Sequence, residues 1–287
     1  MAKLRDVCFV HLGKFGDIAL MLPAFKAVAD EMGKPPVCVV SSTYASILEG
    51  VSYVVPWVMP LHWWGGVGKA KQTAISAGFD PVVVKWWDEP GAQPPIQLGN
   101  AKTITLKIHG KLRRIPAQEW DSFQASQWRY AGFTMEQMME WPLIFDRRDR
   151  RREEELRLRS FRSARPKLLI NASQSGTSPF KFAPQLMALT LGLGCEIVNL
   201  ANVKAHRIYD LLGLYDHAAG LVTTDTATLH LAAASTVPYI AFINDGGSGS
   251  IPKGNCVLTV RYSQFQQNMG WIVDTLKKFA RKEAVFA

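Results

Sequence analysis

The chain has 287 residues, a formal net charge of +9, 48% hydrophobic residues and 20% charged residues. This composition excludes a disordered or fibrous chain, and the length fits two domains of ordinary size. The sequence contains no run of about 18 apolar residues, and its start does not resemble a signal peptide, so we expect an unsecreted, cytoplasmic protein. The four cysteines are far apart and form no C-x-x-C pair, which predicts buried reduced thiols.

The first half alternates between strand and helix patterns. Residues 6–12 form a compact apolar run, residues 13–17 form a glycine turn, and apolar residues then recur at helical spacing until Gly33. Further strands are expected at residues 37–40, 52–55 and 81–85, with a helix at residues 44–49. Strands that are apolar on both faces and alternate with helices indicate a parallel sheet covered on two sides.

The middle of the chain is rich in tryptophan and then in arginine. Eight of the nine tryptophans lie between Pro56 and Trp141, and we interpret them as core packing and carbohydrate stacking, with base stacking as an alternative. Residues 147–167 carry a net charge of +6 and contain a helix expected to start near Arg150. Two interpretations stay open. The segment binds an anionic partner, or it is a solvated helix with Glu153–Arg157 and Glu155–Arg159 pairs.

The second half repeats the alternation. Strands are expected at residues 167–171, 196–200, 220–223 and 238–243, with helices at 184–193, 206–213 and 226–234, the last capped by Asp225. We therefore predict an α/β fold with two doubly wound, Rossmann-like domains facing a central cleft. Residues 1–148 form the first domain, residues 149–166 a charged linker helix, and residues 167–287 the second domain. Whether a C-terminal helix crosses back to the first domain is left open.

Three groups of residues could carry chemistry. Asp17 lies in the first turn of the first helix, where it is either a general base or a helix N-cap. Thr226, Thr228 and the amides that follow Asp225 could hold a diphosphate, with His230 one turn further on, although an isolated histidine is often simply packed. The third group is the loop that carries Ser175, Thr177 and Lys181, which is either a phosphate site or an ordinary loop.

These motifs together resemble a known family. Its pattern is the order Leu12-Gly13-x-x-Gly16-Asp17, Leu22-Pro23-Ala24, Lys181 and Asp225-Thr226-x-x-x-His230-Leu231-Ala232-Ala233-Ala234. This order is similar to that of the ADP-heptose:lipopolysaccharide heptosyltransferases, a family of glycosyltransferases. The similarity covers the first thirty-odd residues and most of the second half.

The resemblance implies a GT-B fold, an acceptor site in the first domain and a nucleotide-sugar site in the second. It also implies inversion at the anomeric carbon without a metal or other cofactor, and the sequence contains no D-x-D triplet. By position Asp17 would be the general base, and Ser175, Thr177, Lys181, Asp225, Thr226 and His230 would bind the donor. The sequence departs from the family at Ala227, where relatives have glycine, and at Asn202, Lys204 and His206, where relatives carry an acidic residue near the ribose.

The acceptor is left open between a saccharide of the lipopolysaccharide or lipid-linked type and a hydroxymethylated base in phage-type DNA. Lys14, Arg113, Arg114 and Trp120 are the expected acceptor-side residues, and peripheral contact with a membrane stays open. The alternative function is a non-catalytic sugar-nucleotide-binding protein of the same fold. The sequence does not specify the sugar, the nucleotide base or the oligomeric state.

Overall fold

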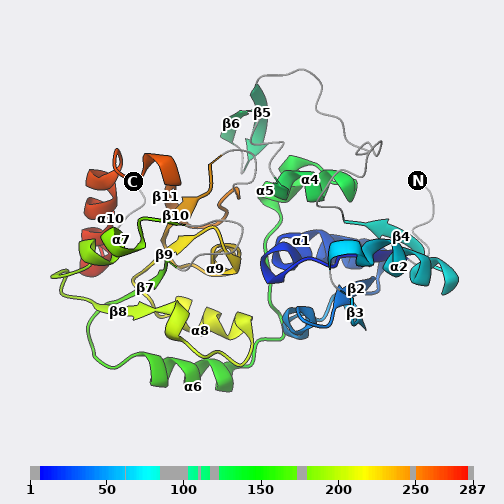
Figure 1. The fold of residues 1–287 in the computed structure, drawn as a ribbon, viewed down its shortest axis with the longest axis horizontal. Coiled ribbons are helices and arrows are strands. Elements are labelled where there is room, and N and C mark those ends of the chain that lie inside the picture. Colours follow the sequence, from blue (N-terminus) through cyan, green and yellow to red (C-terminus); the bar gives the residue numbers. More distant parts are fainter. Residues whose placement is uncertain are drawn as a thin grey trace. The chain divides into compact units, whose positions relative to one another are not determined.

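The computed structural model describes residues 7–61, 63–84, 103–108, 111–116, 123–172, 180–245 and 250–283. The chain divides into two compact units, Met1–Arg147 and Arg148–Ala287, and each is described by itself (Figure 1). In the described ranges, no helix has the length and apolar character needed to cross a bilayer.

The first unit contains a four-stranded sheet in the order β3-β2-β1-β4, with every neighbouring pair parallel. Its strands are β1 (Val7–Val10), β2 (Val37–Ser41), β3 (Val55–Met59) and β4 (Asp80–Val83). The helices between them are α1 (Phe15–Met32), the 3-10 helix η1 (Ala45–Gly50) and α2 (Trp63–Ser76). All four residues of β1 are buried, because this central strand is paired on both edges. The predicted parallel sheet is confirmed.

The rest of the first unit is a hairpin and two short helices. Strands β5 (Thr103–Ile108) and β6 (Lys111–Pro116) pair antiparallel. Helices α4 (Phe123–Tyr130) and α5 (Met135–Glu140) follow, and α4 packs against α1. Trp128 on α4 is 1% exposed, and its Nε1 donates a hydrogen bond to the carbonyl oxygen of Leu20 at 3.1 Å. For Trp128, therefore, core packing is confirmed.

The second unit is built on a five-stranded parallel sheet in the order β11-β10-β9-β7-β8. Its strands are β7 (Lys167–Asn171), β8 (Glu196–Asn199), β9 (Gly220–Thr224), β10 (Tyr239–Ile243) and β11 (Cys256–Arg261). Its helices are α6 (Arg150–Ser160), α7 (Ala183–Leu189), α8 (Leu212–Tyr215), α9 (Ala227–Ala232) and α10 (Met269–Arg281), with 3-10 helices η2 (Leu200–Asn202), η3 (Ile208–Leu211) and η5 (Tyr262–Gln264). A core of aliphatic and aromatic side chains joins this sheet to α7 and α10, which packs on β7 and β9.

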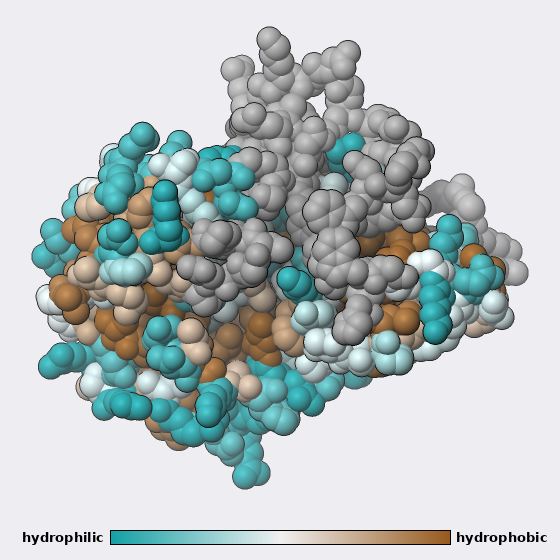
Figure 2. All heavy atoms as spheres, in the orientation of Figure 1, coloured by the Kyte–Doolittle hydropathy of each residue, from teal (hydrophilic) through white to brown (hydrophobic). Residues whose placement is uncertain are grey.

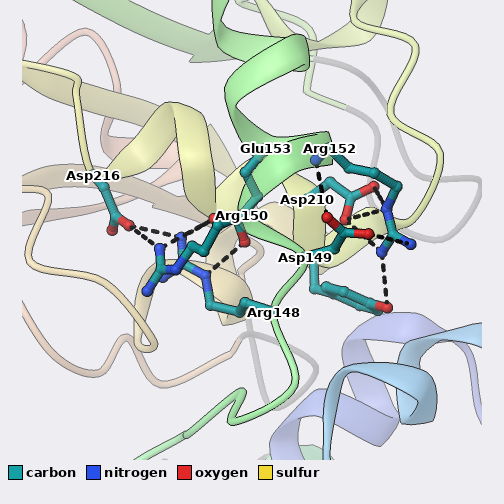
Figure 3. Close-up of polar contacts among 8 residues, drawn as sticks. Arg148, Asp149, Arg150, Arg152, Glu153, Asp210 and Asp216 are labelled. Atoms are coloured by element: carbon teal, nitrogen blue, oxygen red, sulfur yellow. Dashed lines mark hydrogen bonds and ion pairs between the residues drawn. The ribbon is translucent and has the colours of Figure 1, made fainter.

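Ion pairs hold the basic helix α6 against η3 and the end of α8 within the second unit (Figure 3). Arg148 reaches Glu153 at 2.6 Å and Asp216 at 2.6 Å, and Arg152 reaches Asp210 at 3.1 Å. Glu153 is 3% exposed and packs closely against α8. A Cβ added at Gly213 of α8 would lie only 2.5 Å from the Cβ of Glu153. Packing at this distance requires glycine on α8.

The ion pairs on α6 differ from those expected. Glu153 binds Arg148 and Arg150 instead of Arg157, and Arg157 pairs with Glu154 at 2.5 Å. Glu155 pairs with Arg151, while the Nε of Arg159 donates to the backbone oxygen of Glu155. The expected i,i+4 pairs are wrong because other neighbours along the chain take each partner. Arg148 and Arg150 take Glu153, Glu154 takes Arg157, and Arg151 takes Glu155.

Candidate functional site

The turn between β1 and α1 is organised around a buried histidine. Gly13 N donates to His11 Nδ1 at 3.1 Å, so the ring carries its proton on Nε2, which donates to the backbone oxygen of Asp17 at 3.1 Å. Burial lowers the pKa of His11 to about 4, which leaves the ring neutral at pH 7. A Cβ at Gly13 would lie 2.6 Å from His11 Cε1 and 2.7 Å from Asp17 Cβ, so the turn requires glycine here.

This turn holds the Asp17 carboxylate in one orientation. Asp17 is the third residue of α1 and is 9% exposed, and its Oδ2 accepts a hydrogen bond from Lys14 N at 2.7 Å. The N-cap residue is Lys14, so the interpretation of Asp17 as the N-cap is wrong. A carboxylate oriented by the backbone at the carboxyl end of a parallel sheet can serve as a general base.

The turn between β9 and α9 carries a cluster of polar side chains. Asn171, the last residue of β7, donates from Nδ2 to Thr226 Oγ1 at 3.0 Å and to Thr228 Oγ1 at 2.7 Å. Thr228 also lies within hydrogen-bond distance of Thr223 Oγ1 and Thr226 Oγ1, at 2.7 and 2.8 Å. The helix that follows has only six residues, shorter than expected. Phosphate binding here would therefore depend on side chains more than on a helix dipole.

Asp225 has a different role from the one expected. Its Oδ2 accepts a hydrogen bond from Ser250 N at 3.0 Å, and the N-cap of α9 is Thr226. The predicted cap by Asp225 is therefore wrong, because a backbone amide 25 residues away takes the carboxylate. Asp225 instead ties the start of α9 to the segment at Ser250.

His230 and Lys253 lie close together in this part of the second unit. His230 Nε2 is 3.4 Å from Ser250 Oγ. Burial lowers the pKa of His230 to about 4, with Asp225 opposing that shift and Lys253 adding to it. Burial also lowers the pKa of Lys253 to about 8. A neutral imidazole beside an ammonium that is still mostly protonated at pH 7 can donate to and attract phosphate oxygens.

Sequence reasoning did not single out Asn171, Ser250 or Lys253. A signal for Asn171 was present, because a polar residue that ends a buried strand lies where ligands of such sheets bind. Lys253 is brought to His230 by the fold after β10, and its position carries no local signal.

The remaining candidate residues are placed as follows. Lys181 is exposed, with its Nζ 5.2 Å from the centre of the Phe182 ring. Arg113 and Arg114 lie on β6, paired with Leu106 and Thr105 of β5. Ser175, Thr177 and Trp120 lie outside the described residues. The structure thus brings Lys14 and Asp17 together in one unit, and Asp225, Thr226 and His230 together in the other.

No family model and no curated protein matches the sequence. Solved structures match over nearly the whole chain. The E. coli ADP-heptose lps heptosyltransferase II matches with a TM-score of 0.56 and 11% identity, covering 94% of this chain and 99% of that one. The E. coli heptosyltransferase WaaC with ADP matches with a TM-score of 0.53 and 14% identity, covering 96% and 98%. A glycosyl transferase family 9 protein from Veillonella parvula matches with a TM-score of 0.53 and 10% identity, covering 92% and 88%.

These matches agree with the two parallel, helix-covered sheets and with the resemblance in the sequence motifs. The chain has the Rossmann-like GT-B fold of the heptosyltransferases.

Proposed function

We propose that this chain is an inverting, metal-independent glycosyltransferase that moves a sugar from a nucleoside-diphosphate sugar to an acceptor hydroxyl. The observation that carries the proposal is the polar cluster at the start of α9, where Thr226, His230 and Lys253 gather in a unit with this fold. A hydroxyl, an imidazole and an ammonium suit a departing diphosphate.

The donor side of the reaction belongs to the second unit. Thr226 offers a hydroxyl that Asn171 and the buried Thr228 hold in place. Lys253 offers a positive charge in a partly buried setting, where it acts more strongly than in water. Lys181 adds an exposed cation, and Ser175 and Thr177, which lie outside the described residues, are proposed as further donor-binding residues. As the bond from the anomeric carbon to the diphosphate breaks, these groups stabilise the electron pair left on the phosphate oxygen.

The acceptor side belongs to the first unit. Asp17 takes the proton from the acceptor hydroxyl, and the oxygen attacks the anomeric carbon from the face opposite the diphosphate, so the configuration inverts. His11 and Lys14 N fix the turn and the carboxylate, so little reorganisation is needed before proton transfer.

The relatives suggest a first donor to test, and the acceptor stays a choice between two classes. One solved relative holds ADP, and another structure of it holds ADP-2-deoxy-2-fluoro heptose, which supports ADP-heptose as the first donor to test. Other nucleotides should also be tested, because residues 199–207 have Asn202, Lys204 and His206 and no acidic residue, whereas relatives carry an acidic residue near the ribose there. The proposed acceptor is a saccharide of the lipopolysaccharide type or a hydroxymethylated base in DNA, with Arg113, Arg114 and Trp120 on the acceptor side.

The experiment is a transfer assay with the full chain. ADP-, UDP-, GDP- and dTDP-sugars are each combined with a lipopolysaccharide core saccharide or with hydroxymethylated duplex DNA, and products are detected by mass. The proposal expects one donor to release nucleoside diphosphate only when a suitable acceptor is present, and EDTA to leave the rate unchanged. Tight donor binding without release for any acceptor would favour the non-catalytic alternative, and absence of donor binding would contradict both.

A further inference from the structure

A groove of about 720 Å³ lies along β8, the edge strand of the second sheet. Its walls are the last turn of α6, residues 162–165, β8 itself and residues 202–204. The register that pairs Lys167 with Glu196 puts the start of β8 at the amino end of the sheet. Asn171, Thr226 and His230 do not line the groove, so it does not include the phosphate-binding cluster of the candidate donor site. Asn202 and Lys204, which line the groove, belong to the stretch where relatives carry an acidic residue near the ribose.

The groove collects cations that have no carboxylate partner. Arg159, Arg162, Arg165 and Lys204 line it and are exposed, and among the residues that the structure describes none of them is paired with an acidic side chain. The first part of the same basic segment is different, because Arg148, Arg150 and Arg152 are all engaged by Glu153, Asp210 or Asp216 (Figure 3). Hydrophilic side chains cover the lower edge of the view in Figure 2, where Figure 1 places α6.

Among the described residues that line the groove, Glu196 is the one carboxylate, and it is already paired with Lys167. Burial opposes ionisation of Glu196, but Lys167 at 2.8 Å, Ser163, and Arg162 N at 2.7 Å hold its pKa at about 2. Glu196 therefore stays charged and matched by Lys167. It also fixes the backbone of the turn that carries Arg162. Within the described part of the chain, the four cations that line the groove have no paired carboxylate.

We propose that this groove is a second anion-binding site that takes a small ligand carrying two or more phosphate groups. The volume lies in the usual range of small-molecule sites, which favours such a ligand over a polymer. Arginine binds phosphate oxygens through two parallel N–H groups, and three arginines around one groove match an oligophosphate better than a single anion. Asn199 and Asn202 add amide donors on the wall formed by β8 and η2.

The test is calorimetric titration of the full chain with inorganic tripolyphosphate at about 150 mM salt, where attraction to scattered surface charges is largely screened. Arg162→Ala/Arg165→Ala should weaken binding at least tenfold, and Lys204→Ala should weaken it less. The matched control is Arg151→Ala/Arg281→Ala, which removes the same charge from two other exposed positions of this unit and should change affinity less than twofold. Lys181→Ala, at the candidate donor site, should also leave the affinity unchanged.

Three results would overturn the proposal. Equal losses in the two double variants would mean general charge attraction, and loss of binding in Lys181→Ala would place tripolyphosphate at the donor site. Binding of a 20-base-pair duplex without measurable binding of tripolyphosphate would assign the cations to nucleic acid. All of these readouts are independent of glycosyl transfer, so failure of the proposed enzymatic function leaves them interpretable.

Discussion

After β1 the chain turns through Gly13 into the 18-residue helix α1, and after β9 it turns through Asp225 into the six-residue helix α9. The contacts that we describe in the first turn join residues no more than six positions apart, from His11 to Asp17. In the second turn Asn171 reaches Thr226 and Thr228 across 55 and 57 residues, and Asp225 reaches Ser250 across 25.

This difference separates two ways to position functional groups. The first turn fixes one carboxylate through its own backbone and one buried ring, so most of its geometry is encoded locally. Val39 of β2 and Gln127 of α4 also interact with His11 and support the ring from outside the turn. The second turn assembles several hydroxyls and cations from distant segments, so it exists only when the second sheet is complete. We therefore expect single substitutions in the first turn to cause large changes in turnover or stability. Single substitutions around the second turn should cause smaller changes in ligand affinity.

The largest expected effect is that of Asp17→Asn. The amide oxygen can still accept from Lys14 N, but the side chain no longer takes a proton, so turnover should fall by ~10²–10⁴-fold while donor affinity stays the same. The control is Asp30→Asn on the same helix, an exposed carboxylate paired with Lys26, which should keep the wild-type rate. Wild-type turnover of the Asp17 variant with a verified acceptor would reduce this residue to a structural role.

The next effect is a loss of stability in acid that originates in the first turn. His11 has a folded-state pKa of about 4, below the value of about 6.5 in an unfolded chain, so the unfolded state binds the extra proton between these values. The contribution of His11 to the free energy of unfolding is therefore fully present above about pH 6.5. It falls by about 3 kcal/mol as the pH is lowered to about 4.

Urea unfolding measured from pH 4 to pH 7 checks this. In His11→Asn the protein should be less stable near neutrality, and its free energy of unfolding should fall less steeply with decreasing pH. Parallel curves for the variant and the wild type would remove His11 as the source. The lowered pKa of His230 in the second turn should leave part of the slope in place.

A third effect concerns the room inside the first turn. Gly13→Ala would bring a Cβ within 2.7 Å of His11 and Asp17 side-chain atoms, which should cost about 1–3 kcal/mol of stability and displace the carboxylate. Gly68→Ala on α2 is the matched control, since a Cβ there meets no atom within 4 Å and should stabilise the helix by roughly 0.5–1 kcal/mol. Equal unfolding free energies for the two variants would show that the turn can relax around the extra methyl group.

The same contrast explains what the sequence alone could predict. The apolar run of β1, the glycine turn and α1 are local signals, and both parallel sheets follow from strands of this type. The expected helix at residues 44–49 is the 3-10 helix η1, a small difference. A C-terminal helix was expected without bounds, and it is α10, where Ile272, Leu276 and Phe279 show the helical spacing of a buried face.

What could not be predicted depends on partners far away in the sequence. The cap by Asp225 was the natural local expectation, and the amide of Ser250 displaced it. The pairing of Glu153 with Arg148 also depends on the close approach of α6 to α8, which no spacing within the helix reveals. Local patterns therefore predicted most strands of the two parallel sheets, but not α2, the β5–β6 hairpin, α4, α5 or β11. The contacts among polar side chains had to come from the structure.

The smallest expected effect belongs to Lys181, an exposed residue between β7 and α7 that is proposed to bind the donor. If its ammonium faces the donor phosphates, Lys181→Ala should weaken binding of a nucleoside diphosphate by several-fold and leave binding of the bare nucleoside unchanged, because the charge acts on phosphate oxygens. Lys277→Ala on α10 removes a comparable charge elsewhere in the unit and serves as the control in the same titrations. The loss should shrink as salt is raised, since solvent screens an exposed cation. Equal weakening of both ligands would mean that Lys181 acts on the nucleoside or on the local backbone. Binding of the donor phosphates would then be assigned to Thr226, His230 and Lys253 alone.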